Sequence, residues 1–212
     1  MELLIEEEIG TYVTIFYSKA IKLNNMQTIN RTRFWAELPE LQNKSEAINF
    51  LLDKLDASIT IDSLAKYAYV LATIQHETAG TFKPIKEIGS YNYFKYLIGK
   101  LGIMNLEEAN KFKGKGYVQI TGKINYKKFG ELLGIDLLAN PDLALDPETS
   151  WLITELGMSK GLFTGKALKD YIEDSTIDFI GARKIINGKD KAMEIAQLAR
   201  KFFNALSYNP EG

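Results

Sequence analysis

Residues 64–80 read LAKYAYVLATIQHETAG. Apolar side chains fill most positions of this segment, and alanine, the strongest helix former, recurs through it. Asp62 or Ser63 can cap the start of a helix here, and Gly80 can end it. Because a helix that is apolar on most sides must be covered on most sides, the segment predicts a central, buried helix.

Helical patterns flank this central segment on both sides. Residues 45–56 repeat apolar side chains at helical spacing behind Ser45, and residues 12–17 fit a strand and an amphipathic helix about equally. Residues 117–121 alternate as a strand does and end at Gly122. The sequence therefore predicts a mainly α-helical chain with one small β element. Further helices are predicted over residues 93–101, 106–110, 126–133, 147–160, 165–172, 176–186 and 189–206.

The composition limits the classes of partner. The length of 212 residues suits one domain, or one domain with a short extension. With 26 basic and 27 acidic side chains and no lysine- or arginine-rich block, neither a nucleic-acid nor a membrane partner is predicted. The acidic start, Met1 to Glu8, does not fit a signal peptide, and no run reaches the about 18 apolar residues of a membrane span. We expect a chain made in the cytoplasm that reaches any outside substrate by release or delivery.

Glu77 is the first candidate for chemistry. It lies one turn before Gly80, where partial burial and the negative end of the helix dipole both favour the protonated carboxyl. A carboxylic acid that stays protonated near neutral pH is what a general acid for a glycosidic oxygen requires. The alternative is a solvated glutamate at a helix end, which is the commoner situation.

Glu87 lies ten residues further on, beyond Pro84, where the chain has left the helix. A loop could return it to the far wall of a cleft opposite Glu77. Two carboxylates separated by roughly 6.5–9.5 Å leave room for a water and imply inversion. The alternative is an exposed charge beside Lys83 and Lys86.

The predicted strand carries a polar face. Tyr117, Gln119 and Thr121 point to one side, and the apolar residues between them point to the other. Since apolar side chains go to the core, the polar three face a cleft or solvent, and glutamine with threonine can hold a water and a sugar amide. Gly114 and Gly116 allow close backbone approach just before them.

His76 is the only histidine of the chain. A zinc-protease pattern would need a second histidine four residues later, where Gly80 stands. The chain has no cysteine either, so neither a protein metal site nor a Ser-His-Asp triad is predicted. No cofactor is expected. His76 then either supports Glu77 or packs in the core.

These separate segments match one family in order. Residues 72–80, ATIQHETAG, resemble the His-Glu-Thr segment of family 19 glycoside hydrolases, the group of chitinases and phage endolysins. Residues 112–122, FKGKGYVQITG, resemble the family's aromatic-x-Gly-Arg-Gly-x-x-Gln-Leu-Thr stretch. Asn125-Tyr126, residues 140–143 and residues 182–188 follow as similar later segments, so the resemblance covers residues 45–206.

The resemblance implies a lysozyme-like, mainly α fold, with a helical bundle around the central helix and the small β element beside the cleft. It also implies inverting hydrolysis of a β-1,4-linked N-acetylhexosamine polymer by a catalytic domain over residues 45–212. Residues 1–44 would then be an N-terminal extension, an attachment segment or a helical elaboration. By position, Glu77 becomes the general acid, Glu87 the general base, and Thr121 the hydroxyl that holds the attacking water. The expected substrate-binding residues are His76, Tyr117, Gln119, Asn125, Arg183 and Asn187.

Two places depart from the family pattern. Lys115 stands where arginine is usual, which keeps the charge and loses the bidentate fork. Residues 88–111, which carry several tyrosines, do not match the usual connection, and we expect them to reshape one cleft wall. Their aromatic rings either stack on sugars or pack in the core.

The nature of the glycan is the last expectation. Small, cysteine-free members without chitin-binding modules resemble the bacterial and phage branch, which favours peptidoglycan over chitin. Such an enzyme would reach the cell wall through a holin or as part of a phage virion. The alternatives are a chitinase and a catalytically silent glycan-binding or virion structural protein that keeps the fold.

Overall fold

The computed structural model describes residues 28–173 and 175–210, so the segment 12–17 lies outside the described residues. Helices dominate these residues, which confirms the mainly α prediction. The α-helices are α2 (Arg31–Glu37), α3 (Ser45–Ala57), α4 (Leu64–Glu77), α5 (Leu106–Lys111), α6 (Lys123–Leu133), α7 (Pro147–Lys160) and α8 (Ala192–Ala205). The short 3₁₀ helices are η1 (Pro39–Lys44), η2 (Tyr91–Leu97), η3 (Pro141–Leu145), η4 (Leu168–Asp170) and η5 (Gly181–Ile185). The strands are β1 (Ile85–Lys86), β2 (Lys115–Gly116), β3 (Ile172–Glu173) and β4 (Thr176–Ile177).

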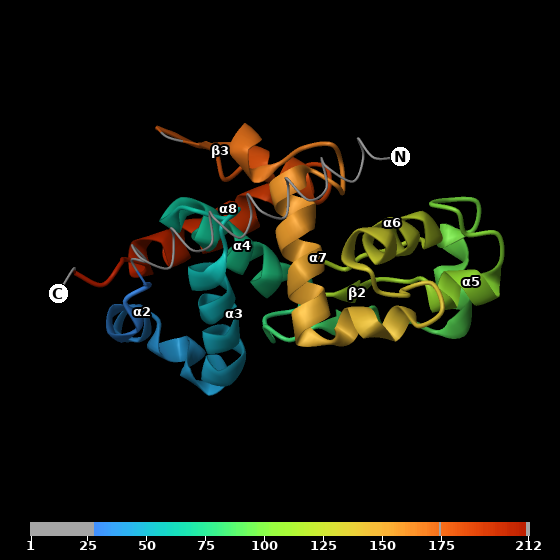
Figure 1. Ribbon diagram of the computed structural model, residues 1–212, viewed down its shortest axis with the longest axis horizontal. Helices are drawn as coiled ribbons and strands as arrows, with labels where there is room; N and C mark the ends of the chain where they lie inside the picture. Colours follow the sequence, from blue (N-terminus) through green and yellow to red (C-terminus); the bar gives the residue numbers. More distant parts are fainter. Residues whose placement is uncertain (1–27, 174, 211–212) are drawn as a thin grey trace, which may run out of the picture.

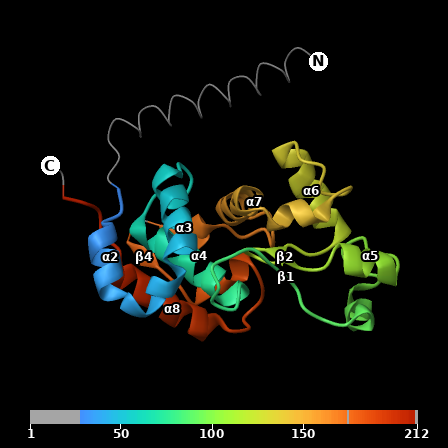
Figure 2. The same cartoon turned by 90° about the horizontal axis from the view of Figure 1, so that it is seen from below.

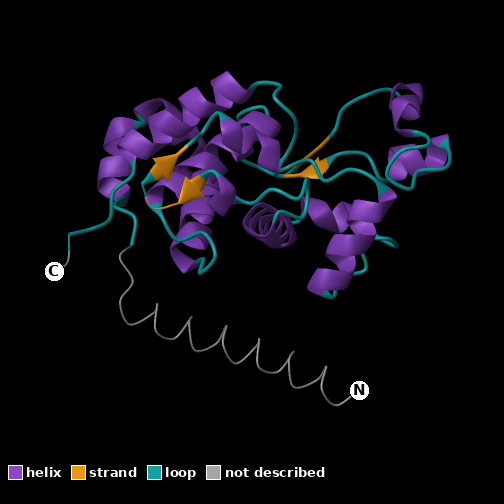
Figure 3. Cartoon of the chain, turned by 90° about the horizontal axis from the view of Figure 1, so that it is seen from above, coloured by secondary structure: helices purple, strands orange, loops and turns teal. Residues whose placement is uncertain are grey.

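Helix α7 stands between two groups of elements. Helices α2, α3, α4 and α8 gather on one side of it, and α5 and α6 lie on the other (Figure 1). The β1–β2 pair runs between the two groups (Figures 2 and 3). Side chains from both groups can therefore meet near the middle of the molecule.

Helix α4 is the predicted central helix. Ser63 caps its start by accepting a hydrogen bond from the backbone N–H of Lys66. Every residue from 65 to 74 is buried, and α8, whose Ile195, Ala199 and Phe202 are buried as well, packs along α4. Small alanines on both helices let the two backbones approach closely, which accounts for the alanine-rich sequence.

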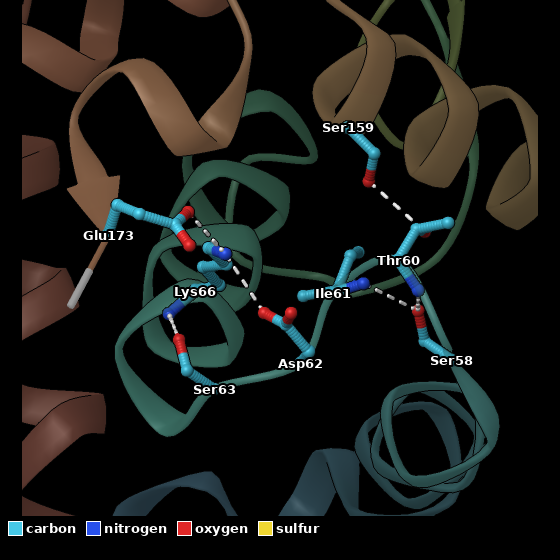
Figure 4. A network of polar contacts seen from close by, with 8 residues as sticks. All are labelled: Ser58, Thr60, Ile61, Asp62, Ser63, Lys66, Ser159 and Glu173. Carbon is cyan, nitrogen blue, oxygen red and sulfur yellow. Dashed lines mark hydrogen bonds and ion pairs between the residues drawn. The ribbon is translucent and has the colours of Figure 1, made fainter. Parts of the chain in front are cut away.

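A polar network fixes the first turn of α4 (Figure 4). The Lys66 ammonium donates to Asp62 Oδ1 and to Glu173 Oε2 of β3, each at 2.9 Å. The loop before α4 is joined to α7 where Ser159 Oγ and Thr60 Oγ1 lie 3.2 Å apart. These bonds set the direction of α4 and so the place where its far end, at Glu77, is delivered.

The predicted strand over residues 117–121 is wrong. The strand is Lys115–Gly116, which pairs antiparallel with β1 in the register Ile85 to Gly116. After Gly116, whose φ is 88°, the chain turns back so that Ile120 bridges Lys115, and Gln119 adopts a left-handed φ of 52°. A tight turn has no alternating faces, so the period-two pattern did not decide which side chains are buried.

The region between α7 and α8 also differs from the prediction. The helices expected over residues 165–172 and 176–186 are replaced by η4 and η5 with the β3–β4 hairpin between them, and the helix expected over residues 93–101 is replaced by η2, which covers only Tyr91–Leu97. Asp170 and Asp178 accept hydrogen bonds from the backbone three residues away, at Ala167 N and Gly181 N, and so favour short turns over helix. Residues 28–173 and 175–210 thus hold two small sheets instead of one.

Residues 28–44 pack on the helical group around α4. Ile29, Phe34, Leu38 and Leu41 are buried, and the Phe34 ring stacks on that of Phe202 at 6.2 Å. The expected division of the chain between residues 44 and 45 stays a prediction. None of the helices in residues 28–173 and 175–210 combines the length and the apolar character that a bilayer span needs.

Candidate active site

A cavity of about 380 Å³ lies where the end of α4 meets the turn after β2. Segments far apart in the sequence contribute its walls, which is typical of a substrate site. Five of the expected site residues meet there, namely Glu77, Gln119, Thr121, Asn125 and Asn187. The remaining walls are Leu101, Val118, Ile120, Phe163 and Ile186.

Glu77 is the last residue of α4, and the helix end is tightly built. The Thr78 N–H donates to Ile74 O at 3.0 Å, and the Thr78 hydroxyl accepts from the backbone N–H of Phe82 at 3.1 Å. Ala79 and Gly80 then take left-handed φ values of 49° and 73°, which turn the chain away. The glutamate is left at the mouth of the cavity with its side chain 16% exposed.

Arg183 of η5 contacts Glu77 directly. Its Nη1 donates to Glu77 Oε1 at 2.6 Å, its Nε donates to the Asp190 carbonyl at 2.9 Å, and its side chain is only 4% exposed. Arg183 was expected to bind substrate, and the structure places it behind Glu77 instead of among the residues that line the cavity.

The turn after β2 presents polar groups to the cavity. Gln119 Nε2 donates to the carbonyls of Ile85 and Gly116, each at 2.9 Å, which fixes the side chain and leaves its carbonyl oxygen as an acceptor. The Thr121 hydroxyl donates to Gln119 O at 2.9 Å, and Asn125 Nδ2 donates to Thr121 O at 2.8 Å. Acceptors therefore converge here for the N–H and O–H groups of a sugar.

Glu87 follows β1 and lies beside Gln119 without lining the cavity. Its Oε2 accepts from Gly114 N at 3.2 Å, and its Oε1 accepts from the Tyr96 hydroxyl at 2.9 Å. A Cβ at position 114 would lie 2.8 Å from Gln119 Oε1 and 3.1 Å from Glu87 Oε2. Gly114 is therefore the point at which the two side chains come together.

Two expected residues lie elsewhere. Tyr117 was expected to share a face with Gln119, and that is wrong, because the turn buries it beside a separate cavity of about 550 Å³. There it adjoins Phe82 and Pro84. His76 does not line the site cavity either. It lies near Glu194 of α8, the pKa of which is lowered first by the hydrogen bond from Lys191 and more weakly by His76.

Lys115, the departure noted in the sequence, is a buried cation behind the site. Its ammonium lies 3.6 Å from Asp142 Oδ1 and 5.2 Å from the centre of the Tyr126 ring. Burial lowers its pKa to about 8, against the opposing pull of Asp142. The sequence pointed to Lys115 because it departs from the family pattern. No such local pattern pointed to the hydrogen bond between Tyr96 and Glu87.

No group of three or more His, Cys, Asp or Glu side chains suited to a metal ion occurs in residues 28–173 and 175–210. The chemistry that this cavity can offer is acid–base chemistry by carboxyl groups, with amide and hydroxyl groups to orient a polar ligand.

Comparisons with known proteins agree with this arrangement. Residues 66–154, which hold most of α4, both β1 and β2, and most of the site, match the family model for class I chitinases of glycoside hydrolase family 19. Chitinase 8 of Oryza sativa subsp. japonica is 38% identical over 73 residues. The resemblance to family 19 glycoside hydrolases is confirmed. The match covers 32% of this chain and 24% of the rice protein, so the chain spans about a quarter of that relative.

Solved structures extend the likeness to the fold as a whole. Chitinase C from Streptomyces griseus HUT6037 matches with a TM-score of 0.55 and 20% identity, over 83% of this chain and 75% of that one. A bacterial family 19 chitinase matches with a TM-score of 0.52 and 20% identity, over 86% and 97% of the two chains. The mainly α fold of these family 19 chitinases therefore extends well beyond residues 66–154.

Proposed function

We propose that this chain is an inverting glycoside hydrolase that cleaves β-1,4 bonds in a chitin-type polymer of N-acetylhexosamine. The observation that carries the proposal is the cavity in which Glu77 meets Gln119, Thr121 and Asn125, with Glu87 beside it. Two carboxyl groups in different surroundings are the minimum that this chemistry needs. The confirmed family resemblance supports the same reaction.

The geometry suggests a role for each group. Arg183 occupies Glu77 Oε1, so Glu77 Oε2 is the oxygen that would carry the proton to the glycosidic oxygen as the bond to the leaving sugar breaks. Glu87, whose two carboxylate oxygens are oriented by the Tyr96 hydroxyl and the Gly114 N–H, would take a proton from the attacking water. The net reaction adds one water across the bond; Glu87 then releases its proton to solvent, and Glu77 regains one from solvent.

Thr121 would hold that water. Its hydroxyl hydrogen is committed to Gln119 O, so its lone pairs remain free to accept a hydrogen bond from the water. Asn125 and Gln119 would orient the N-acetyl and hydroxyl groups of the sugar next to the scissile bond. Attack on the face opposite the leaving group gives inversion.

The substrate class that we propose is chitin and not peptidoglycan. The sequence favoured peptidoglycan, with delivery through a holin or a virion, yet the matched proteins are chitinases and nothing in the cavity calls for a peptide-bearing glycan. Peptidoglycan is therefore the second arm of the experiment. A silent glycan-binding protein would have no use for both carboxyl groups.

The deciding experiment is mass spectrometry of the products from chitin hexamer and from purified peptidoglycan, with proton NMR of the first-formed anomer. We expect shorter chitin oligomers with new α-anomeric ends. Glu77→Gln should lower kcat by at least about 1,000-fold, and the variant should still unfold cooperatively on heating. Glu131→Gln, on the exposed face of α6, is the matched control and should keep full activity.

Each other outcome has a defined meaning. Products from peptidoglycan alone would move the substrate class, and products from neither glycan would refute the enzymatic function. Full activity in the folded Glu77→Gln variant would remove Glu77 from the role of acid.

A further inference from the structure

Segment 88–111, the part of the chain that departs from the family pattern, reaches Glu87 through the side chain of Tyr96. The Tyr96 hydroxyl donates to Glu87 Oε1 at 2.9 Å. Tyr96 belongs to η2, whereas the other donor to Glu87, the Gly114 N–H, lies next to β2. The two carboxylate oxygens are thus held by two different elements.

The ring of Tyr96 is itself firmly placed. The Tyr93 ring meets it edge-on at 5.6 Å, and Tyr93 in turn packs edge-on against the buried Phe94 at 5.2 Å. The amide of Asn110 in α5 donates to the Tyr91 carbonyl at 3.0 Å and ties η2 to that helix. A Cβ at Gly89 would stand 2.5 Å from the Tyr93 ring, so glycine is required for this packing.

We infer that Tyr96 is a positioning residue for the general base, and that η2 serves to hold Glu87 in one orientation as an ionised carboxylate. The inference rests on the proposed function. Burial and the Glu87 carboxylate both raise the pKa of the Tyr96 phenol, so it stays a donor throughout the neutral range. Tyr96 is 46% exposed and Glu87 is half-buried.

The consequence is a specific kinetic signature. Tyr96→Phe keeps the ring and removes only the donor, so the ionised form of Glu87 loses part of its stabilisation. The acid limb of the pH–kcat profile should move up by about one pH unit, and kcat at the optimum should fall about tenfold. KM should change little, because the Tyr96 hydroxyl faces Glu87 and not the cavity.

Tyr93→Phe is the matched control. Tyr93 belongs to the same 3₁₀ helix and is 54% exposed. The substitution removes its hydroxyl group, which, unlike that of Tyr96, does not donate to Glu87. Charged or titratable groups on and beside the elements around Glu87 are unchanged in both variants, so they cannot produce a difference between them. They include Lys86, Lys95, Lys113, Lys115, Tyr126 and Asp142.

The experiment combines pH–kcat profiles on chitin hexamer with carboxyl ¹³C NMR titration of glutamate-labelled protein. The Glu87 signal is assigned from its loss in Glu87→Gln. In Tyr96→Phe we expect this signal to titrate at higher pH than in wild type, by the same interval as the acid limb, while Tyr93→Phe matches wild type.

The inference is overturned if Tyr96→Phe leaves both the limb and the Glu87 titration unchanged, or if Tyr93→Phe moves them equally. That result, with Glu87→Gln inactive, would leave the proposed function intact. Full activity in Glu87→Gln, or no activity of wild type on either glycan, would instead reject Glu87 as the base and the inference with it.

Discussion

At position 114 the site depends on the absence of a side chain. Gly114 donates to Glu87 Oε2, and a Cβ there would press on both Glu87 and Gln119. In Gly114→Ala both side chains have to move away, and displacement of a reacting group by about 1 Å can cost about 100-fold in rate. We therefore expect kcat/KM on chitin hexamer to fall about 100-fold with a change in unfolding free energy below about 1 kcal/mol.

Gly134→Ala is the opposite case. Gly134 ends α6 with a φ of 66° and has no atom within 4 Å of the position of its missing Cβ. Alanine there should cost about 1–2 kcal/mol of stability through backbone strain alone and leave kcat/KM unchanged. Equal losses of activity in the two variants would mean that Gly114 serves the fold and not the site.

The site residues differ in how far the sequence could find them. Glu77, Gln119 and Thr121 lie in short sequence motifs that resemble those of the family. The resemblance therefore predicted that they line one cavity, as they do. The contact between Tyr96 and Glu87 is different, because it depends on how η2 lies against β1 and no spacing rule predicts that. The predicted position of Tyr117 is wrong because residue 117 lies in a turn, where side chains do not alternate between two faces as they do in a strand.

Among the elements, those with a helical repeat and a cap were predictable. Helices α3, α4 and α7 begin within a residue of the positions that their apolar repeat and capping residues predict. The helices predicted within residues 165–186 are wrong because the apolar repeat there is weak. Hydrogen bonds from backbone N–H groups to nearby aspartates, and the pairing of β3 with β4, stabilise short turns and a hairpin instead. Elements of two residues carry too little pattern to be found from sequence.

Strand β2 also holds a buried lysine with a consequence for stability. The pKa of Lys115 is about 8 in the folded protein against 10.5 for an ordinary lysine, because burial disfavours the charge. The unfolded chain therefore binds more protons between these values, and stability rises as the pH is raised through them. Below pH 8 the cost of the charge is fully present, at about 3 kcal/mol.

Lys115→Met removes this titration. The free energy of unfolding of wild type, relative to the variant, should rise by about 3 kcal/mol between pH 7 and pH 10.5, as measured by urea denaturation at intervals across that range. Lys127→Met, which removes an exposed lysine from α6, controls for the loss of one positive charge. A wild-type curve that stays parallel to that of Lys115→Met would show that Lys115 stays fully charged in the folded protein.

Over the whole molecule, the site exists because α7 separates two groups of elements that contribute different chemistry. The helical group around α4 and α8 delivers Glu77, and the group around β2 and α6 delivers Gln119, Thr121 and Asn125 (Figure 1). The first group is completed by residues 28–44, which precede the family motifs. Its packing therefore bears on where the catalytic unit begins.

Phe34 is the residue that tests this. It is fully buried in α2, stacks on Phe202 of α8 and meets the Trp35 ring edge-on at 5.1 Å. Phe34→Ala in the full chain should lower the unfolding free energy by about 3–5 kcal/mol, whereas Glu37→Ala on the exposed side of α2 should change it by less than about 0.5 kcal/mol.

A comparison of fragments 28–212 and 45–212 tests whether the catalytic unit needs residues 28–44 in order to fold. Loss of Ile29, Phe34, Leu38 and Leu41 removes four buried side chains at about 1.5–3 kcal/mol each, a large part of the about 5–15 kcal/mol that stabilises a typical domain. We expect fragment 28–212 to unfold cooperatively on heating and fragment 45–212 to show no cooperative transition by circular dichroism. If both fragments melt alike, and Phe34→Ala melts with wild type, residues 28–44 form a dispensable cover and the catalytic unit begins at residue 45.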